Sequence, residues 1–129
     1  MSIFGTHSLQ KLETCHSDIQ AVVKKVAELC DIIVVCGHRD RRDQEKAFET
    51  GTSKLHYPES KHNSLPSLAV DLAPCSKKGD IDWNDLKSFD GLSRKVKKIA
   101  SMFDVKLVWG GDFSHFKDRP HYELKHLGQ

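Results

Sequence analysis

The sequence lacks long hydrophobic runs, closely spaced cysteine pairs and an excess of charge of one sign. A membrane-spanning helix needs roughly 20 consecutive apolar residues, and no segment approaches that length, so we expect no stable association with a membrane. The net charge is only +2 at pH 7, which argues against a dedicated nucleic-acid-binding protein. A mildly basic surface is compatible instead with an anionic polymer such as a bacterial cell wall.

The cysteines also argue against a disulfide framework. Cys15, Cys30, Cys36 and Cys75 contain no Cys-x-x-Cys pair, and most of them lie in apolar patterns that are typical of reduced, packed thiols.

The first residues have neither the basic region nor the long apolar segment of a secretory signal. We therefore expect the protein to be made and initially kept in the cytoplasm.

Glycine and proline are scarce as well, with 8 and 4 residues, which argues against a collagenous or disordered chain. The composition, 38% hydrophobic and 29% charged, is that of an ordinary globular protein. A length of 129 residues fits one domain with one core. We expect residues 1–129 to form that single domain.

Apolar residues at helical spacing predict two long helices. The first covers residues 8–29, either from an N-cap at Ser8 or broken near Ser17. The second covers about residues 85–103, after a cap at Asp82 or Asn84. Its expected inward residues are Leu86, Phe89, Leu92, Val96, Ile99 and Phe103.

A shorter, charged helix is expected over residues 41–50, with Ala47 and Phe48 directed inward and Gly51 as its stop. Residues 52–67, which contain two prolines and several serines, predict a long irregular loop. Loops of this length in compact domains are often functional.

Short β-branched or alternating segments predict strands. They cover residues 32–36, 68–72, 105–109 and 121–124. Together with the helices, they predict an α+β fold in which helices pack mainly on one face of a small antiparallel sheet.

Two histidines and one aspartate are candidate zinc ligands. His62 lies in the expected long loop, Asp71 in an otherwise apolar strand, and His121 at the start of the last strand. A catalytic zinc takes three such ligands and keeps one position open. A metal or cation would explain an aspartate that is costly to bury alone. The alternative is a solvent-facing Asp71 with surface histidines, and His38 and His115 are reserve ligands.

Charged side chains near these ligands suggest further roles. The spacing Asp118-x-x-His121 lets both groups approach one water, so Asp118 is the candidate general base. Glu123 is a competing carboxylate, because in a strand it shares a face with His121. Arg39 follows a predicted strand and either binds a substrate carboxylate or stabilises a developing oxyanion. The non-functional alternatives are an exposed Asp118 in a charged loop and a solvated helix start that contains Arg39.

Several segments, taken in order, resemble a family of zinc peptidases that includes D-alanyl-D-alanine carboxypeptidases and phage L-alanyl-D-glutamate endopeptidases. The matching segments are residues 35–39 with Gln44, 60–62, 69–74, 81–83, 109–112 and 118–124. The resemblance implies the fold of that family, the zinc ligands His62, Asp71 and His121, the general base Asp118 and the substrate-orienting Arg39. It also implies that Ser60 contacts substrate or supports the loop before His62.

Small size, the absence of a signal and the aspartate at position 118 favour the endopeptidase branch, which resembles phage endolysins. The resemblance then implies a monomer that hydrolyses the L-alanyl-D-glutamate bond in the peptide stem of peptidoglycan. It would be released from the host cytoplasm to the wall through a lesion made by a separate holin. The alternatives are a D-alanyl-D-alanine carboxypeptidase and a non-catalytic, zinc-stabilised wall-binding module. Extra residues at 63–67 depart from the commoner family pattern and leave the conformation of that loop open.

Overall fold

The computed structural model describes residues 5–125, so the expectation about a signal at the first residues lies largely outside it. The helices are α1 (Thr6–Leu12), α2 (Ser17–Leu29), α3 (Arg41–Glu49) and α4 (Leu86–Met102), and two 3-10 turns are η1 (Lys61–Asn63) and η2 (Gly110–Asp112). The strands are β1 (Ile32–Cys36), β2 (Ala69–Pro74), β3 (Leu107–Trp109) and β4 (His121–Leu124). Within the described residues, no helix is long and apolar enough to cross a membrane.

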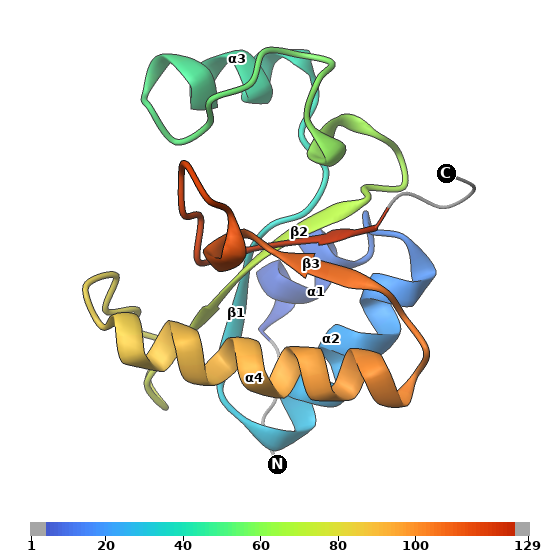
Figure 1. Cartoon of the computed structure of the whole chain (residues 1–129), viewed down its shortest axis with the longest axis vertical. Helices are drawn as coiled ribbons and strands as arrows, with labels where there is room; N and C mark the ends of the chain where they lie inside the picture. The colour runs from blue at the N-terminus through green and yellow to red at the C-terminus, as the bar shows by residue number, and fades with distance from the viewer. Residues whose placement is uncertain (1–4, 126–129) are drawn as a thin grey trace.

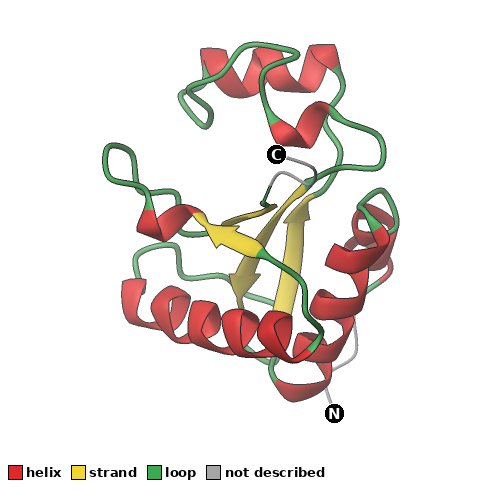
Figure 2. Ribbon diagram, turned by 45° about the vertical axis from the view of Figure 1, so that its right-hand side comes forward, coloured by secondary structure: helices red, strands yellow, loops and turns green. Residues whose placement is uncertain are grey.

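The strands form one antiparallel sheet in the order β1-β2-β4-β3 (Figures 1 and 2). In the two central strands, Val70 pairs with Tyr122 and Asp71 pairs with His121. Because side chains alternate along a strand, Val70 and Tyr122 join the hydrophobic core, whereas Asp71 and His121 lie on the opposite face. The sheet therefore separates the core from the polar residues singled out above.

The core lies between the sheet and the helices α1, α2 and α4. The helix α2 contributes Ile19, Val22 and Val26, each fully buried, and α4 contacts both α2 and β2. Burying one such aliphatic side chain contributes about 1.5–3 kcal/mol. The predicted α+β class, with helices mainly on one face of a small antiparallel sheet, is confirmed.

The helix caps differ from the predicted ones. The first helix is broken as expected near Ser17, but the N-cap of α2 is His16, whose Nδ1 accepts a hydrogen bond from the Asp18 N–H at 3.0 Å. Ser8 lies inside α1, where its Oγ accepts from the Val34 N–H at 3.1 Å. For α4 the cap is Asp85, whose carboxylate accepts from Ser88. Any side-chain acceptor at the start of a helix can satisfy one of the free N–H groups there. The sequence therefore does not show which of several neighbouring residues is the N-cap.

The helix α3 does not pack on the sheet. It lies beyond one end of the sheet, away from the other helices (Figure 1). Phe48 is 38% exposed and stacks on the His56 ring, with 3.7 Å between ring centroids, and Ala47 is only half-buried. The predicted inward pair is therefore wrong, and Gln44 is the buried residue of α3.

The ends of α4 also differ from the prediction. Leu86 and Phe103 are 47% and 41% exposed, whereas Phe89, Leu92, Val96 and Ile99 are buried as expected. Leu86 is the first residue of α4 and Phe103 is its C-cap, so both lie at the ends of the helix, outside its buried stripe.

Candidate active site

His62, Asp71 and His121 meet on the face of the sheet opposite the core. The Nε2 atom of His62 lies 3.2 Å from Oδ1 of Asp71 and 3.3 Å from Nδ1 of His121. The distance between His121 Nδ1 and Asp71 Oδ1 is 3.3 Å. All three residues are buried. Segments far apart in the sequence therefore place three potential metal-ligand atoms at the corners of a nearly equilateral triangle.

The triangle fits a small divalent cation. In a tetrahedral zinc site with bonds of about 2.0–2.1 Å, neighbouring ligand atoms lie about 3.3 Å apart. The observed edges are 3.2–3.3 Å, and the donor set of two imidazole nitrogens and one carboxylate oxygen is one that zinc accepts. Three protein ligands leave a fourth position open.

Further hydrogen bonds orient both imidazoles. His62 Nδ1 donates to the Gly37 carbonyl at 2.7 Å, which leaves Nε2 to face Asp71. His121 Nε2 donates to Oε1 of Glu123 at 2.7 Å, which directs Nδ1 into the triangle. The other oxygen of Glu123 pairs with Lys61 at 3.1 Å. Metal-binding histidines are commonly held by such a partner on the second nitrogen, and Glu123 has that supporting position.

Arg39 occupies the remaining oxygen of Asp71. Its Nη2 donates to Asp71 Oδ2 at 3.2 Å, and its Nη1 donates to Gln44 Oε1 at 3.3 Å. The two charged side chains are only 12% and 11% exposed. Asp71 is therefore buried and paired on both oxygens, and the alternative of a solvent-facing aspartate is wrong.

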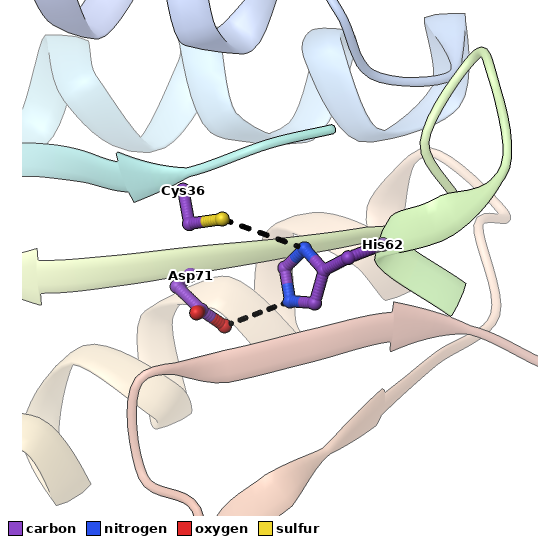
Figure 3. A group of neighbouring side chains, drawn as sticks. All are labelled: Cys36, His62 and Asp71. Atoms are coloured by element: carbon purple, nitrogen blue, oxygen red, sulfur yellow. Dashed lines mark hydrogen bonds and ion pairs between the residues drawn. The ribbon is translucent and has the colours of Figure 1, made fainter. Parts of the chain in front are cut away.

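Cys36 offers a second group of ligands that sequence analysis missed. The ligand atoms of Cys36, His62 and Asp71 lie within 4.8 Å of one another and could hold a metal ion (Figure 3). Cys36 Sγ lies 3.9 Å from His62 Nδ1, a nitrogen that already donates to Gly37. Its apolar strand predicted a packed thiol, and only the pairing of Cys36 with Asp71 across β1 and β2 reveals its position.

The charge of Asp71 controls the ionisation of both histidines. Burial opposes the positive charge on His62, but the hydrogen bond to Asp71 outweighs burial and raises the pKa of His62 to about 10. For the same reasons the pKa of His121 is raised to about 9. Burial also disfavours the Asp71 carboxylate, yet the two imidazoles hold its pKa well below the ordinary value. In the metal-free protein, protons on the two imidazoles thus occupy the space between the three ligand atoms, where a cation fits.

Asp118 lies beside the triangle in the loop between η2 and β4. Its backbone N–H donates to Gly110 at 2.9 Å, and its carbonyl accepts from His121 at 3.1 Å. A side chain at Gly110 would collide with the Asp118 backbone, so glycine permits this close approach. Burial, and next the negative charge of Asp71, raise the pKa of Asp118 above its ordinary value.

The loop that carries His62 has a defined local structure. Ser60 Oγ accepts from the His62 N–H at 3.1 Å, and Asn63 Oδ1 accepts from the Ser60 N–H at 3.0 Å. This reciprocal capping box fixes the turn η1. Asn63 Nδ2 also donates to the Arg39 carbonyl at 3.2 Å. A short 3-10 turn thus directs His62 into the site, and the residues 64–66 that follow it, whose conformation the sequence left open, form bends without regular secondary structure.

A cleft of about 540 Å³ opens over these residues. Its lining includes Arg39, Ser60, His62, Asp118, His121 and Glu123. His115 lines the cleft as well, but within residues 5–125 no hydrogen bond or ion pair links it or His38 to the triangle. The triangle of ligand atoms therefore forms without the two reserve ligands.

A buried His–Asp–His triangle with an open position, a neighbouring carboxylate and a cleft is typical of a metal-dependent hydrolase. Residues 1–126 match the family model described as phage L-alanyl-D-glutamate peptidase. The chain therefore belongs to this peptidase family, and the predicted family and enzyme class are confirmed.

Individual relatives agree with this assignment. The chain is 32% identical over 124 residues to the L-alanyl-D-glutamate peptidase of Escherichia phage T5, with 95% of this chain and 88% of that protein covered. It is 30% identical over 130 residues to the peptidoglycan L-alanyl-D-glutamate endopeptidase CwlK of Bacillus subtilis strain 168, with 84% and 74% covered. The crystal structure of the Serratia marcescens L-Ala D-Glu endopeptidase ChiX matches with a TM-score of 0.80 at 25% identity, over 95% of this chain and 89% of that one.

Proposed function

We propose that this protein hydrolyses the L-alanyl-D-glutamate bond in the peptide stem of bacterial peptidoglycan, with zinc held by His62, Asp71 and His121. The observation that carries the proposal is the triangle of ligand atoms with edges of 3.2–3.3 Å, of which His62 and His121 border the same cleft as Asp118. When bound there, zinc supplies a Lewis acid that polarises the scissile carbonyl and makes water more acidic.

Asp118 is the general base in this proposal. Its carboxylate takes a proton from the attacking water and then passes it to the amine of the departing glutamate residue. No side-chain hydrogen bond or ion pair holds this carboxylate within the described residues, so it is free to accept the proton. A pKa raised by burial and by Asp71 also makes it a better base than an ordinary aspartate.

Arg39 and Ser60 orient the substrate. Arg39 uses two N–H groups on Asp71 and Gln44, and its remaining N–H groups stabilise the negative charge that develops on the scissile carbonyl. Ser60 Oγ already accepts from His62, which leaves its hydroxyl hydrogen to donate to the stem peptide. In this proposal Arg39 acts on the oxyanion that develops at the scissile carbonyl, rather than on a free carboxylate of the stem.

His121 is preferred to Cys36 as the third ligand. The triangle with His121 has edges of at most 3.3 Å, whereas the group with Cys36 extends to 4.8 Å. In addition, Cys36 faces the nitrogen of His62 that donates to Gly37. Using that nitrogen for a metal would break a short, buried hydrogen bond, which is costly.

The wider role that we infer is lysis of the bacterial host. Similarity to the phage T5 peptidase supports an enzyme that is made in the host cytoplasm and reaches the wall through a holin lesion. We propose that residues 1–129 act as one catalytic domain and as a monomer, with peptidoglycan as the partner rather than nucleic acid or membrane.

Mass spectrometry of peptidoglycan fragments tests the reaction. Digestion of purified walls should give stem fragments with a new N-terminal D-glutamate, and a zinc chelator should abolish them. Release of free D-alanine without such fragments would assign the protein to the carboxypeptidase alternative. Wall binding without any fragment would assign it to a non-catalytic module.

A further inference from the structure

The cleft contains a lysine with no carboxylate partner. Arg39 binds Asp71 at 3.2 Å, and Lys61 binds Glu123 at 3.1 Å. Lys54 lines the same cleft, but within the described part of the chain it forms no ion pair. Its positive charge is therefore available to an anionic group that enters the cleft.

The residues on both sides of Lys54 are held by a buried amide. Gln44 is 0% exposed, and its Nε2 donates to Ser53 Oγ at 2.9 Å and to the Leu55 carbonyl at 2.7 Å. The Oε1 atom of the same side chain accepts from Arg39. One amide thus ties both neighbours of Lys54 to the arginine that holds Asp71, so this wall of the cleft has a fixed position relative to the metal site.

An aromatic ring from the opposite loop holds the ammonium group. Lys54 Nζ lies 5.1 Å from the centroid of the Phe116 ring, and Phe116 also lines the cleft. The loop after η2, which contains Phe116, rises toward the segment that follows α3 (Figure 1). A cation over an exposed ring is held only weakly. Because the lysine stem is flexible, the ammonium can turn to a carboxylate without moving the backbone.

The substrate of the proposed function supplies such a carboxylate. A glutamate residue within a stem uses its amine and one carboxyl group in the chain, so its other carboxyl group is free and ionised at neutral pH. That anion lies beside the bond to be broken. We propose that Lys54 and Phe116 form a subsite for a free carboxylate of the stem peptide. This inference rests on the proposed function, because that function defines the substrate.

Three synthetic stem peptides test the subsite. One has all carboxylates free, the second has the glutamate carboxylate amidated, and the third has the carboxylates of the following residue amidated. The zinc-loaded proteins are the wild type, Lys54→Met, Lys54→Arg and the matched control Lys98→Met, which changes an exposed lysine of α4. For each combination of protein and peptide we would measure kcat/KM. Calorimetry on the same proteins with the additional substitution Asp118→Asn would give the Kd of each peptide without its hydrolysis.

The wild type should prefer the first peptide to the second by about tenfold, as expected for one charge-assisted contact at an accessible site. Lys54→Met should abolish the preference by weakening only the peptides that retain the recognised carboxylate, whereas Lys54→Arg and Lys98→Met should keep it. Discrimination against the third peptide instead would assign the same subsite to the following residue. Equal losses on all peptides, or an unchanged preference in Lys54→Met, would overturn the proposal.

The two proposals fail in different ways. If the wild type hydrolyses none of the peptides, the proposed function is wrong, and the Kd values still decide whether Lys54 selects a carboxylate. If the wild type cleaves the first peptide but Lys54→Met shows the same selectivity, only the subsite is wrong.

Discussion

The two faces of the central strands, β2 and β4, bury different kinds of side chain. On the core face, Val70 and Tyr122 are 1% exposed and pack with apolar side chains. On the other face, Asp71 and His121 are nearly as deeply buried, at 7% and 8%, yet their side chains are held by hydrogen bonds and ion pairs. Burying charge costs free energy unless each group is paired. The site face is therefore organised for binding a cation, and the core face supplies the stability that permits it.

Removing one ligand should have the largest effect on the site face. His121→Ala should lose zinc and lower kcat/KM by more than about a thousandfold, since a metal Lewis acid contributes several kcal/mol. Cys36→Ser is the matched control and should retain both properties. Calorimetric zinc titration and hydrolysis of a stem peptide check this. Loss of zinc in Cys36→Ser with retention in His121→Ala would assign the metal to the cysteine group.

Asp118→Asn should separate chemistry from metal binding. The amide cannot take a proton, so hydrolysis should fall by about 10²–10⁴-fold, while zinc affinity stays within a few-fold of the wild type. The same titration and kinetic assays apply. Equal loss of zinc in Asp118→Asn and His121→Ala would make Asp118 a ligand instead of the base.

The pH dependence of stability should differ between the metal-free and zinc-loaded proteins. The pKa values of His62 and His121 are raised from 6.5 to about 10 and about 9, so their protonation stabilises the metal-free fold fully below about pH 6.5. This contribution is lost as pH rises toward 9–10. The Tm of the metal-free protein should fall over this range.

In the proposed site zinc would take the place of those protons, so its affinity should rise with pH and binding should release protons. Thermal melts with and without a chelator, and zinc titrations in buffers of different ionisation enthalpy, measure both effects. A Tm of the metal-free protein that rises between pH 7 and 9 would contradict the electrostatic account of the site.

Tyr122→Phe should have the smallest effect, and it tests the core face one residue from a proposed ligand. The Tyr122 hydroxyl is buried without a hydrogen-bond partner among the described residues. Removing it should leave the free energy of unfolding unchanged or raise it by up to about 1 kcal/mol. Zinc affinity should not change. A large loss of stability in denaturant unfolding would show that the hydroxyl has a partner.

Sequence patterns located most of the framework because they depend on local periodicity. The strands at 32–36 and 121–124 and the buried residues of α4 follow directly from alternation and helical spacing. The roles of Gln44 and Cys36 could not be found in this way. Gln44 looks like an exposed residue of a charged helix, and Cys36 like a packed thiol, until pairing across the fold gives each its neighbours.

The sequence indicates the composition of the proposed site but not its geometry. His62, Asp71 and His121 were identified from residue type and resemblance, whereas their separations depend on the register of β2 with β4 and on the turn η1. The engagement of Arg39 with Asp71 was not expected, since an arginine at the end of a strand has no fixed direction in sequence alone.

The capping box at η1 has a consequence for protein engineering. Ser60 and Asn63 hold His62 from its own side of the loop, and the Leu68 N–H donates to the Lys61 carbonyl at 3.1 Å, which closes the base of the loop. Between these anchors Leu65 is 72% exposed. A short peptide inserted at residues 64–66 should therefore extend outward and leave the position of His62 unchanged.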